Sequence, residues 1–185
     1  MALTKTPVCD FGKKAEDFKL KSIYNKVFTL NDIKGEKATL IMFICNHCPY
    51  VKAIIKDLAK DCNEIKKNGI NSVAIMSNDT KNYPEDSFDN MIKFAKVNNF
   101  GQTNYLIDET QEIAKKYGAV CTPDFFGYNK DLKLQYRGRF RELKDLKPTS
   151  TGDSDLKLAM KMISETQVGP REQVPSMGCN IKWFK

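Results

Sequence analysis

The chain has 185 residues, of which 41% are hydrophobic, and it carries a formal net charge of +7. This length and composition favour one compact unit with a single hydrophobic core, so we expect a single domain over residues 1–185. The charge does not indicate a nucleic-acid site, because only four of the 30 Lys and Arg residues are Arg, the side chain favoured for phosphate and base recognition.

The first predicted elements are two short strands and a longer one. Strands at residues 18–20 and 27–30 flank the turn-forming Tyr24-Asn25, and together they predict an N-terminal β-hairpin. Residues 38–44 read ATLIMFI, a continuous apolar run that is typical of a central strand buried on both faces.

A helix is predicted directly after this central strand. Apolar residues recur at intervals of three and four after Cys48-Pro49, and the pattern ends near Asn68-Gly69. Pro49 suits a first helical turn. The segment Cys45 to Cys48 therefore lies where a buried strand passes into the start of a helix.

The second half of the chain continues the alternation of strands and helices. Further strands are expected at residues 73–76, 105–107, 125–128 and 132–136, and further helices at 84–97, 109–117 and 153–165. Parallel strands need crossover helices, so the pattern predicts an α/β fold with a central mixed sheet flanked by helices. Residues 1–16 form an expected N-terminal arm, and residues 168–185 an expected extended tail.

The sequence favours a cytoplasmic location. The N-terminal stretch has no apolar segment of the length that a secretory signal needs, and the apolar run at residues 40–45 is too short to cross a bilayer. Six cysteines in a long, Lys-rich chain indicate thiols that take part in chemistry rather than a scaffold of structural disulfides. We expect no membrane and no nucleic acid among the partners.

The motif Cys45-Asn46-His47-Cys48 is the strongest chemical signal. In an α/β pattern, a C-x-x-C between a strand and a helix is typical of a redox pair. A disulfide needs β-carbons about 4 Å apart, which such a turn can provide. A helix N-terminus stabilises an anion by about 0.3–2 kcal/mol. We expect Cys45 and Cys48 to be catalytic, with Cys45 the more exposed and more acidic thiol.

His47, the only histidine of the chain, is expected to tune this pair. A unit positive charge about 4 Å from a thiolate is worth about 4 kcal/mol at an effective dielectric near 20. The alternative is a histidine that lies on the surface, or in the core with its hydrogen bonds satisfied, and has no role in the chemistry. The two cysteines would also suit half of a zinc site, but no second C-x-x-C or H-x-x-H completes the tetrahedron. We therefore expect no metal and no cofactor.

Four further cysteines have different prospects. Cys121 adjoins Thr122-Pro123 and Cys179 lies in the tail, so both are candidate auxiliary thiols, with simple burial as the alternative. Cys62 lies on the apolar stripe of the first long helix and is expected to be an inert core residue. Cys9 lies in the arm and belongs to no motif.

Several segments, in the same order, resemble a bacterial subgroup of redox proteins: FICNHCPYVKAI, SNDTKNYPEDS, DETQEIAKKYGAVCTPDFF and PSMGCNIKW. From Phe18 to the C-terminus the chain resembles thioredoxin-like proteins of the redoxin, or alkyl hydroperoxide reductase/thiol-specific antioxidant, superfamily. The resemblance implies a thioredoxin-like fold, Cys45 as nucleophile, Cys48 as resolving cysteine and Pro123 as a cis proline facing the disulfide. Asn46 and Thr122, beside these residues, are expected to tune the site.

The leading functional prediction is a thiol-disulfide oxidoreductase acting on protein or small-molecule thiols and disulfides. Thioredoxin has Gly-Pro between its cysteines, whereas this chain has Asn46-His47, and the His resembles the DsbA-type C-P-H-C motif, which belongs to a strong oxidant.

Two alternatives remain open. Cys45-x-x-Cys48-Pro49 resembles the T-x-x-C-P pattern of peroxiredoxins, which would make Cys48 a peroxidatic cysteine acting on peroxides, with Arg137 or Arg139 as its electrostatic partner. A metal-binding or copper-chaperone protein would use the cysteine pair with a distant histidine, which this chain lacks.

Overall fold

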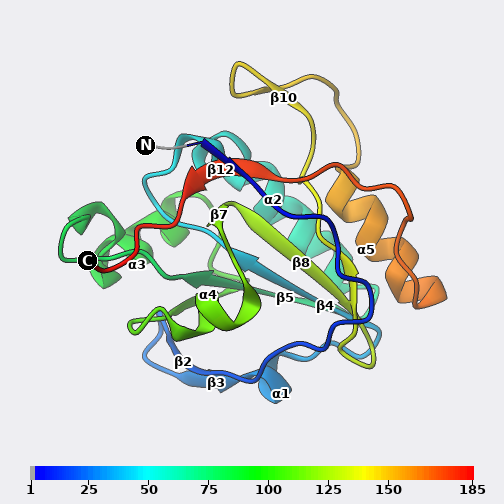
Figure 1. Ribbon diagram of the computed structural model, residues 1–185, viewed down its shortest axis with the longest axis horizontal. Helices are drawn as coiled ribbons and strands as arrows, with labels where there is room; N and C mark the ends of the chain where they lie inside the picture. The colour runs from blue at the N-terminus through cyan, green and yellow to red at the C-terminus, as the bar shows by residue number, and fades with distance from the viewer. Residues whose placement is uncertain (1–2) are drawn as a thin grey trace.

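A seven-stranded mixed sheet forms the centre of the molecule (Figure 1). The computed structural model describes residues 3–185. In spatial order the strands are β3 (Val27–Thr29), β2 (Lys19–Ser22), β6 (Asn104–Ile107), β5 (Ile70–Met76), β4 (Ala38–Phe43), β8 (Asp124–Asn129) and β9 (Leu134–Tyr136). The three strands β6, β5 and β4 run parallel, and the other neighbours pair antiparallel. The expected α/β class with a central mixed sheet is confirmed.

Strand β4 lies between β5 and β8 and is buried along its whole length. Side chains alternate along a strand, so Leu40 and Met42 enter the core on one face, and Ile41 and Phe43 enter the core on the other. Each such side chain stabilises the fold by about 1.5–3 kcal/mol when buried. This two-sided burial explains the unbroken apolar run in the sequence.

Helices cover both faces of the sheet. The helices α2 (Pro49–Lys66), α3 (Phe88–Val97) and α5 (Asp155–Thr166) contribute to the core on one face, and α1 (Leu30–Ile33) and α4 (Glu112–Tyr117) to the core on the other. Within residues 3–185, none of the helices combines the length and the apolar character needed to span a membrane.

A second, small sheet joins the two ends of the chain. The strand β12 (Met177–Asn180) pairs with β1 (Leu3–Lys5) on one side and with β7 (Cys121–Thr122) on the other, and Figure 1 shows β12 beside the N-terminal strand. A Cβ at Gly178 would lie 2.0 Å from the Thr122 carbonyl oxygen, so only glycine permits this approach. The tail at residues 168–185 contains no helix, as expected, and its residues 177–180 form a sheet strand.

Two predicted helices begin later than the sequence indicates. The predicted helix 84–97 is interrupted, because Ser87 is extended between the short 3-10 helix η1 (Pro84–Asp86) and α3. The predicted helix 109–117 begins at Glu112. Gln111 has a φ of 64°, and its side-chain amide donates hydrogen bonds to the carbonyl oxygens of Ser77 and Lys182. Tertiary contacts thus override local propensity.

The hairpin formed by β10 (Leu143–Lys144) and β11 (Lys147–Pro148) was not predicted. Its two turn residues, Asp145 and Leu146, have positive φ angles of 50° and 60°. Tight hairpins with this backbone usually carry Asn or Gly, so the sequence lacks the ordinary turn signal. The hairpin projects from the rest of the molecule (Figure 1).

Candidate active site

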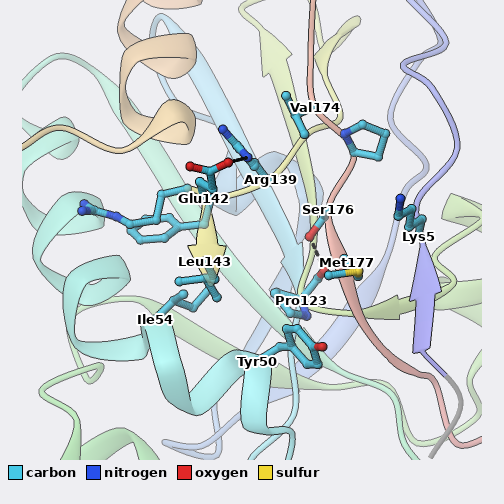
Figure 2. A pocket seen from close by; sticks show the side chains of 13 residues that line it. Lys5, Tyr50, Ile54, Pro123, Arg139, Glu142, Leu143, Val174, Ser176 and Met177 are labelled. Atoms are coloured by element: carbon cyan, nitrogen blue, oxygen red, sulfur yellow. Dashed lines mark hydrogen bonds and ion pairs between the residues drawn. The ribbon is translucent and has the colours of Figure 1, made fainter. Parts of the chain in front are cut away.

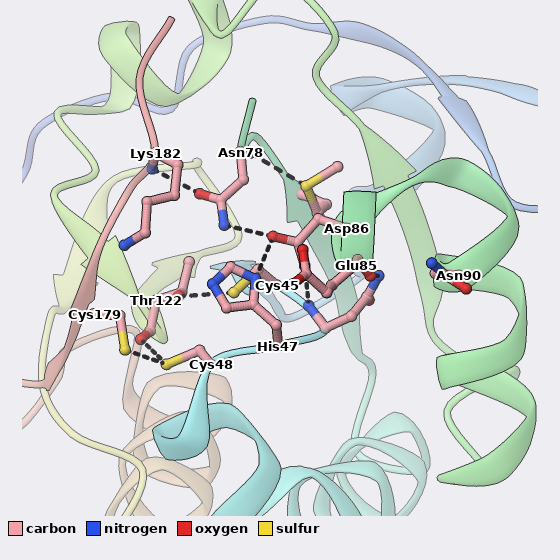
Figure 3. A network of polar contacts seen from close by, with 12 residues as sticks. Cys45, His47, Cys48, Asn78, Glu85, Asp86, Asn90, Thr122, Cys179 and Lys182 are labelled. Carbon is pink, nitrogen blue, oxygen red and sulfur yellow. Dashed lines mark hydrogen bonds and ion pairs between the residues drawn. The ribbon is translucent and has the colours of Figure 1, made fainter. Parts of the chain in front are cut away.

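Cys45 and Cys48 lie in the loop that joins β4 to α2 (Figure 3). Both are buried, with exposed fractions of 1% and 0%. Cys48 directly precedes Pro49, the first residue of α2, and the backbone N–H of Val51 in the first turn donates a hydrogen bond to the Cys48 sulfur. The fold therefore brings two thiols to a helix start, where N–H groups favour negative charge.

Thr122 contacts both sulfurs. The Cys45 Sγ atom lies 3.3 Å from Thr122 Oγ1, and Cys48 Sγ lies 3.1 Å from the Thr122 carbonyl oxygen, to which a protonated Cys48 can donate. The Thr122-Pro123 peptide bond is cis, as the resemblance implied. The strand β7 thus brings Thr122 and Pro123 to the paired cysteines.

His47 pairs with Asp86, a residue that sequence analysis did not select (Figure 3). The His47 Nδ1 atom lies 2.7 Å from Asp86 Oδ2. The ring also stacks on Tyr83, with centroids 5.8 Å apart and planes 6° from parallel. The imidazole is therefore fixed from two sides.

Asp86 is fully buried and accepts further hydrogen bonds. The backbone N–H of Asn46 donates to Oδ1 at 2.8 Å, and the Asn78 side-chain amide donates to Oδ2 at 2.8 Å. Burying a carboxylate is costly unless hydrogen bonds compensate. The network around Asp86 therefore fixes the C-x-x-C loop against η1.

Asn46 bridges the loop to two other elements. Its side-chain Nδ2 donates to the Glu85 backbone carbonyl oxygen at 3.1 Å, and its side-chain Oδ1 accepts a hydrogen bond from the Tyr105 hydroxyl at 2.9 Å. On the far side of Asp86, the backbone N–H of Lys182 donates to Asn78 Oδ1 at 2.9 Å. The C-terminal segment is thereby connected to the same network.

The electrostatics of the thiols differ from the sequence-based expectation. The pKa of Cys48 is lowered to about 5, chiefly because the Cys45 thiol donates a hydrogen bond to the Cys48 thiolate, with further support from Cys179 and Val51. The pKa of Cys45 is raised, because it keeps this shared proton, because it is buried and because Asp86 is near. The prediction that Cys45 is the more acidic thiol is wrong for this structure. Cys48 is the thiol that loses its proton first as the pH rises.

We expect a thiolate to appear near pH 5 and to belong to Cys48. The ultraviolet absorbance of the thiolate, followed against pH, measures this directly. Cys48→Ser should remove the transition, and Cys45→Ala should move it to higher pH because the donor to the thiolate is lost. Cys9→Ser is the matched control and should leave the transition in place. A transition that survives Cys48→Ser would contradict the assignment.

We expect the pKa of His47 to lie above its ordinary value of 6.5, mainly because it is hydrogen-bonded to Asp86. The interaction stabilises the fold below pH 6.5, and this contribution is lost as the pH rises through the folded-state value. An NMR titration of the single imidazole measures the pKa. Asp86→Asn should lower the pKa, and an equal value in wild type and variant would show that Asp86 does not hold the proton.

The remaining cysteines lie in different surroundings. Cys179 Sγ is 3.1 Å from Cys48 Sγ (Figure 3), whereas Cys121 Sγ faces the Pro123 carbonyl oxygen at 3.6 Å. Burial raises the pKa of Cys62 to about 12, and this residue is in the core, as expected. Of the two candidate auxiliary thiols, the structure brings Cys179 into sulfur contact with the pair.

Sequence reasoning missed the acidic partner of His47 although a signal was present. The polar loop after residues 73–76 follows a strand parallel to the one that precedes Cys45. In open α/β sheets the carboxyl ends of parallel strands meet at one edge and form the functional crevice. This rule points to the loop that carries Asn78 and Asp86, but not to a particular carboxylate.

A pocket of 260 Å³ opens beside Pro123 (Figure 2). Its lining combines apolar side chains, such as Tyr50 and Ile54, with the charged Lys5, Arg139 and Glu142. Tyr50 is the second residue of α2, so the pocket adjoins the start of the helix that directly follows the two thiols. A hollow of this kind is suited to binding a small molecule or a side chain of another protein.

Three potential metal ligands gather at the site. Cys45 Sγ, a ring nitrogen of His47 and a carboxylate oxygen of Asp86 lie within 4.8 Å of one another. Both Asp86 oxygens already accept hydrogen bonds, and three donors are one fewer than a structural zinc site uses. The arrangement therefore favours orientation of His47 over ion binding.

The two arginines considered for a peroxidatic site have partners elsewhere. Arg137 donates to both oxygens of Asp124 and to the Gly118 carbonyl oxygen. Arg139 pairs with Asp155 at 2.6 Å. Both guanidinium groups are thus paired with carboxylates, and within residues 3–185 neither forms a hydrogen bond with Cys45 or Cys48.

The mixed sheet, the helices on both faces and the C-x-x-C at a helix start define a thioredoxin-like redoxin. The model of the AhpC/TSA family matches residues 11–137, and the chain belongs to this family. A search of curated proteins found no match.

Solved structures share the fold of this chain. An uncharacterized conserved protein from Geobacillus kaustophilus is 40% identical, with a TM-score of 0.94 over 100% of this chain and 97% of that chain. A hypothetical protein from Sinorhizobium meliloti is 37% identical, with a TM-score of 0.89 and 98% of each chain covered. The thioredoxin domain of a thiol-disulfide oxidoreductase from Bacteroides vulgatus shares the fold at 18% identity, with a TM-score of 0.58 over 69% of this chain and 86% of that chain.

Proposed function

We propose that this protein is a thiol-disulfide oxidoreductase in which Cys45 and Cys48 form the redox pair. One observation carries the proposal: the two thiols lie together at the start of α2, where Thr122 contacts both sulfurs. A thiolate is the attacking species in disulfide exchange, and the lowered pKa of Cys48 supplies one thiolate to the pair near neutral pH.

The reaction proceeds in two exchanges. The Cys45 sulfur attacks a substrate disulfide while its proton passes to Cys48, so that a Cys45–substrate bond forms and the other substrate sulfur leaves as a thiolate and takes up a proton. Cys48 then gives up its proton, and its thiolate attacks Cys45 Sγ and releases the second substrate sulfur. The substrate gains two electrons and the pair becomes a disulfide. The reverse sequence oxidises a dithiol.

The pocket beside Pro123 indicates the class of partner. Its apolar lining with charged groups from Lys5, Arg139 and Glu142 suits an extended, thiol-bearing protein segment or a small thiol. We propose protein or small-molecule thiols and disulfides as partners, without nucleic acid or membrane. We also propose that residues 1–185 act as one domain in the cytoplasm, where disulfides are usually transient and catalytic.

Equilibration with glutathione buffers tests the proposed pair. The dithiol and disulfide forms are quantified by alkylation and mass spectrometry at a series of glutathione ratios. Wild type should show one two-electron transition between dithiol and Cys45–Cys48 disulfide, and its midpoint gives the reduction potential. If no Cys45–Cys48 disulfide forms at any ratio, the proposal is overturned.

The pKa of Cys48, about 5, favours thiol peroxidase activity as a second candidate. The Cys48 thiolate would attack a peroxide oxygen and become a sulfenic acid, with water or an alcohol as the other product. The Cys45 thiol would then condense with the sulfenic acid and release water. In this case a Cys45→Ser/Cys179→Ser double variant, which lacks both neighbouring thiols that could condense with Cys48, should accumulate a Cys48 sulfenic acid that reacts with dimedone. Cys48→Ser should consume no hydrogen peroxide.

A further inference from the structure

Cys48 has two thiol neighbours, not one. Cys45 precedes it in the C-x-x-C loop and is the largest influence on its pKa, and the Cys48 sulfur lies 3.1 Å from Cys179 Sγ (Figure 3). The proposed redox cycle uses only the first of these contacts. Cys48 is thus the central member of a three-sulfur row that ends at Cys179.

The surrounding structure holds Cys179 in this place. Residue 179 is paired directly with Thr122 between β12 and β7, and Gly178 permits the close approach of the two strands. Three residues earlier in the chain, the Ser176 hydroxyl donates to the Pro123 carbonyl oxygen at 2.8 Å. The strand that carries Cys179 is therefore attached to the same Thr122-Pro123 segment that contacts Cys45 and Cys48.

Backbone pairing on the other side restricts Cys179 further. The residue is also paired with Leu3 of β1, so β12 is the central strand of its small sheet. Its side chain is 4% exposed. A buried thiol held against Cys48 is shielded from partners in solution and has Cys48 as its accessible exchange partner.

We infer that Cys179 is a third redox thiol, which exchanges with the Cys45–Cys48 disulfide to form a Cys48–Cys179 disulfide. The inference rests on the proposed function for the first disulfide. Cys179 loses its proton and its sulfur attacks Cys48 Sγ, the bond from Cys48 to Cys45 breaks, and Cys45 leaves as a thiolate that takes up the proton. No electrons enter or leave the protein.

The exchange has two consequences. Cys45 becomes a free thiol while the oxidising equivalent is kept between two buried sulfurs. The C-terminal segment, already bonded to Asn78 through Lys182, becomes covalently joined to the start of α2. The enzyme then has a stored oxidised form, which returns to the Cys45–Cys48 disulfide when Cys45 attacks Cys48 and Cys179 leaves.

Mass spectrometry of tryptic peptides under non-reducing conditions distinguishes the two disulfides. Cys45 and Cys48 lie in one tryptic peptide, residues 38–52, and Cys179 lies in another, residues 172–182. The full-length protein is oxidised with oxidised glutathione, excess thiols are alkylated, and the linked pair of peptides is measured. We expect the linked pair in wild type and in Cys45→Ser, and its loss in Cys48→Ser and Cys179→Ser.

Cys121→Ser is the matched control, because Cys121 is buried beside the same segment but faces Pro123. This variant should retain the linked peptides. Absence of the linked pair in both wild type and Cys45→Ser overturns the inference, as does a link that contains Cys121. Cys45→Ser leaves β12 unchanged, so the test does not depend on the folding of Cys179→Ser.

Failure of the proposed function gives a different pattern. If the linked pair forms in Cys45→Ser but wild type never contains a Cys45–Cys48 disulfide, the Cys48–Cys179 bond exists without the exchange, and the relay is overturned together with the function. If wild type contains the Cys45–Cys48 disulfide and never the linked pair, the function stands and only the third thiol is overturned.

Discussion

Cys48→Ser is expected to accumulate mixed disulfides with protein thiols through Cys45, whereas Cys45→Ser is expected to accumulate none. The intermediate on Cys45 persists in the first variant because the sulfur that would displace the substrate is gone. Thiol-disulfide exchange in both variants should fall by several orders of magnitude, as removal of a nucleophile usually does. Non-reducing electrophoresis after incubation with a disulfide-containing protein shows the trapped species.

Cys9→Ser is the control for this experiment. Cys9 is only partly buried, and burial raises the pKa of its thiol to about 11, so it should neither trap substrate nor slow exchange. Trapping by Cys45→Ser instead of Cys48→Ser would make Cys48 the attacking thiol and would support the peroxidase candidate. Equal trapping by both variants would contradict the assignment of separate roles.

Asp124→Ala is expected to destabilise the fold by about 3–5 kcal/mol, because it leaves the Arg137 guanidinium buried without its counterion. Asp124 is fully buried, Arg137 is 9% exposed, and Nη2 of Arg137 lies 3.0 Å from Asp124 Oδ2. Burial raises the pKa of Asp124 although Arg137 opposes this. Burial of this charged pair therefore costs desolvation free energy, and removal of one partner costs more because the other charge stays buried.

Urea unfolding of the variant, followed by circular dichroism, gives the change in the free energy of unfolding. The control is Lys60→Gln, which removes an exposed pair with Glu64 at 4.0 Å, and which should change stability by at most about 0.5 kcal/mol. Replacement of both Asp124 and Arg137 by apolar residues should cost less than Asp124→Ala alone. Equal losses for Asp124→Ala and Lys60→Gln would contradict the role of the buried pair.

Most of the main sheet could be predicted because its signals are local. The N-terminal hairpin forms as β2 and β3 within two residues of the predicted limits, and the apolar run at residues 38–44 becomes β4. The small sheet was not predicted, since β1, β7 and β12 have two to four residues each. Segments of that length carry no period, and their pairing depends on a partner more than 50 residues away.

The same distinction holds for the candidate site. Cys45, His47 and Cys48 are adjacent in sequence, so a motif of four residues and its position before a helix predict a redox pair. The contacts of this motif with Thr122, Asp86 and Cys179 join residues that are 39 to 131 positions apart. Their positions follow from the order of strands in the sheet, which leaves few local traces.

The sequence by itself determined the α/β class, the central strand, the helix that follows it and the position of a C-x-x-C motif at a helix start. These depend on periodicity and on neighbouring residues, which a single chain displays directly. The tertiary structure alone decided which thiol is acidic and which distant groups contact it. A pKa depends on burial and on hydrogen bonds from all sides. Cys48 receives them from Cys45, Val51 and Cys179, whereas Cys45 is buried near Asp86.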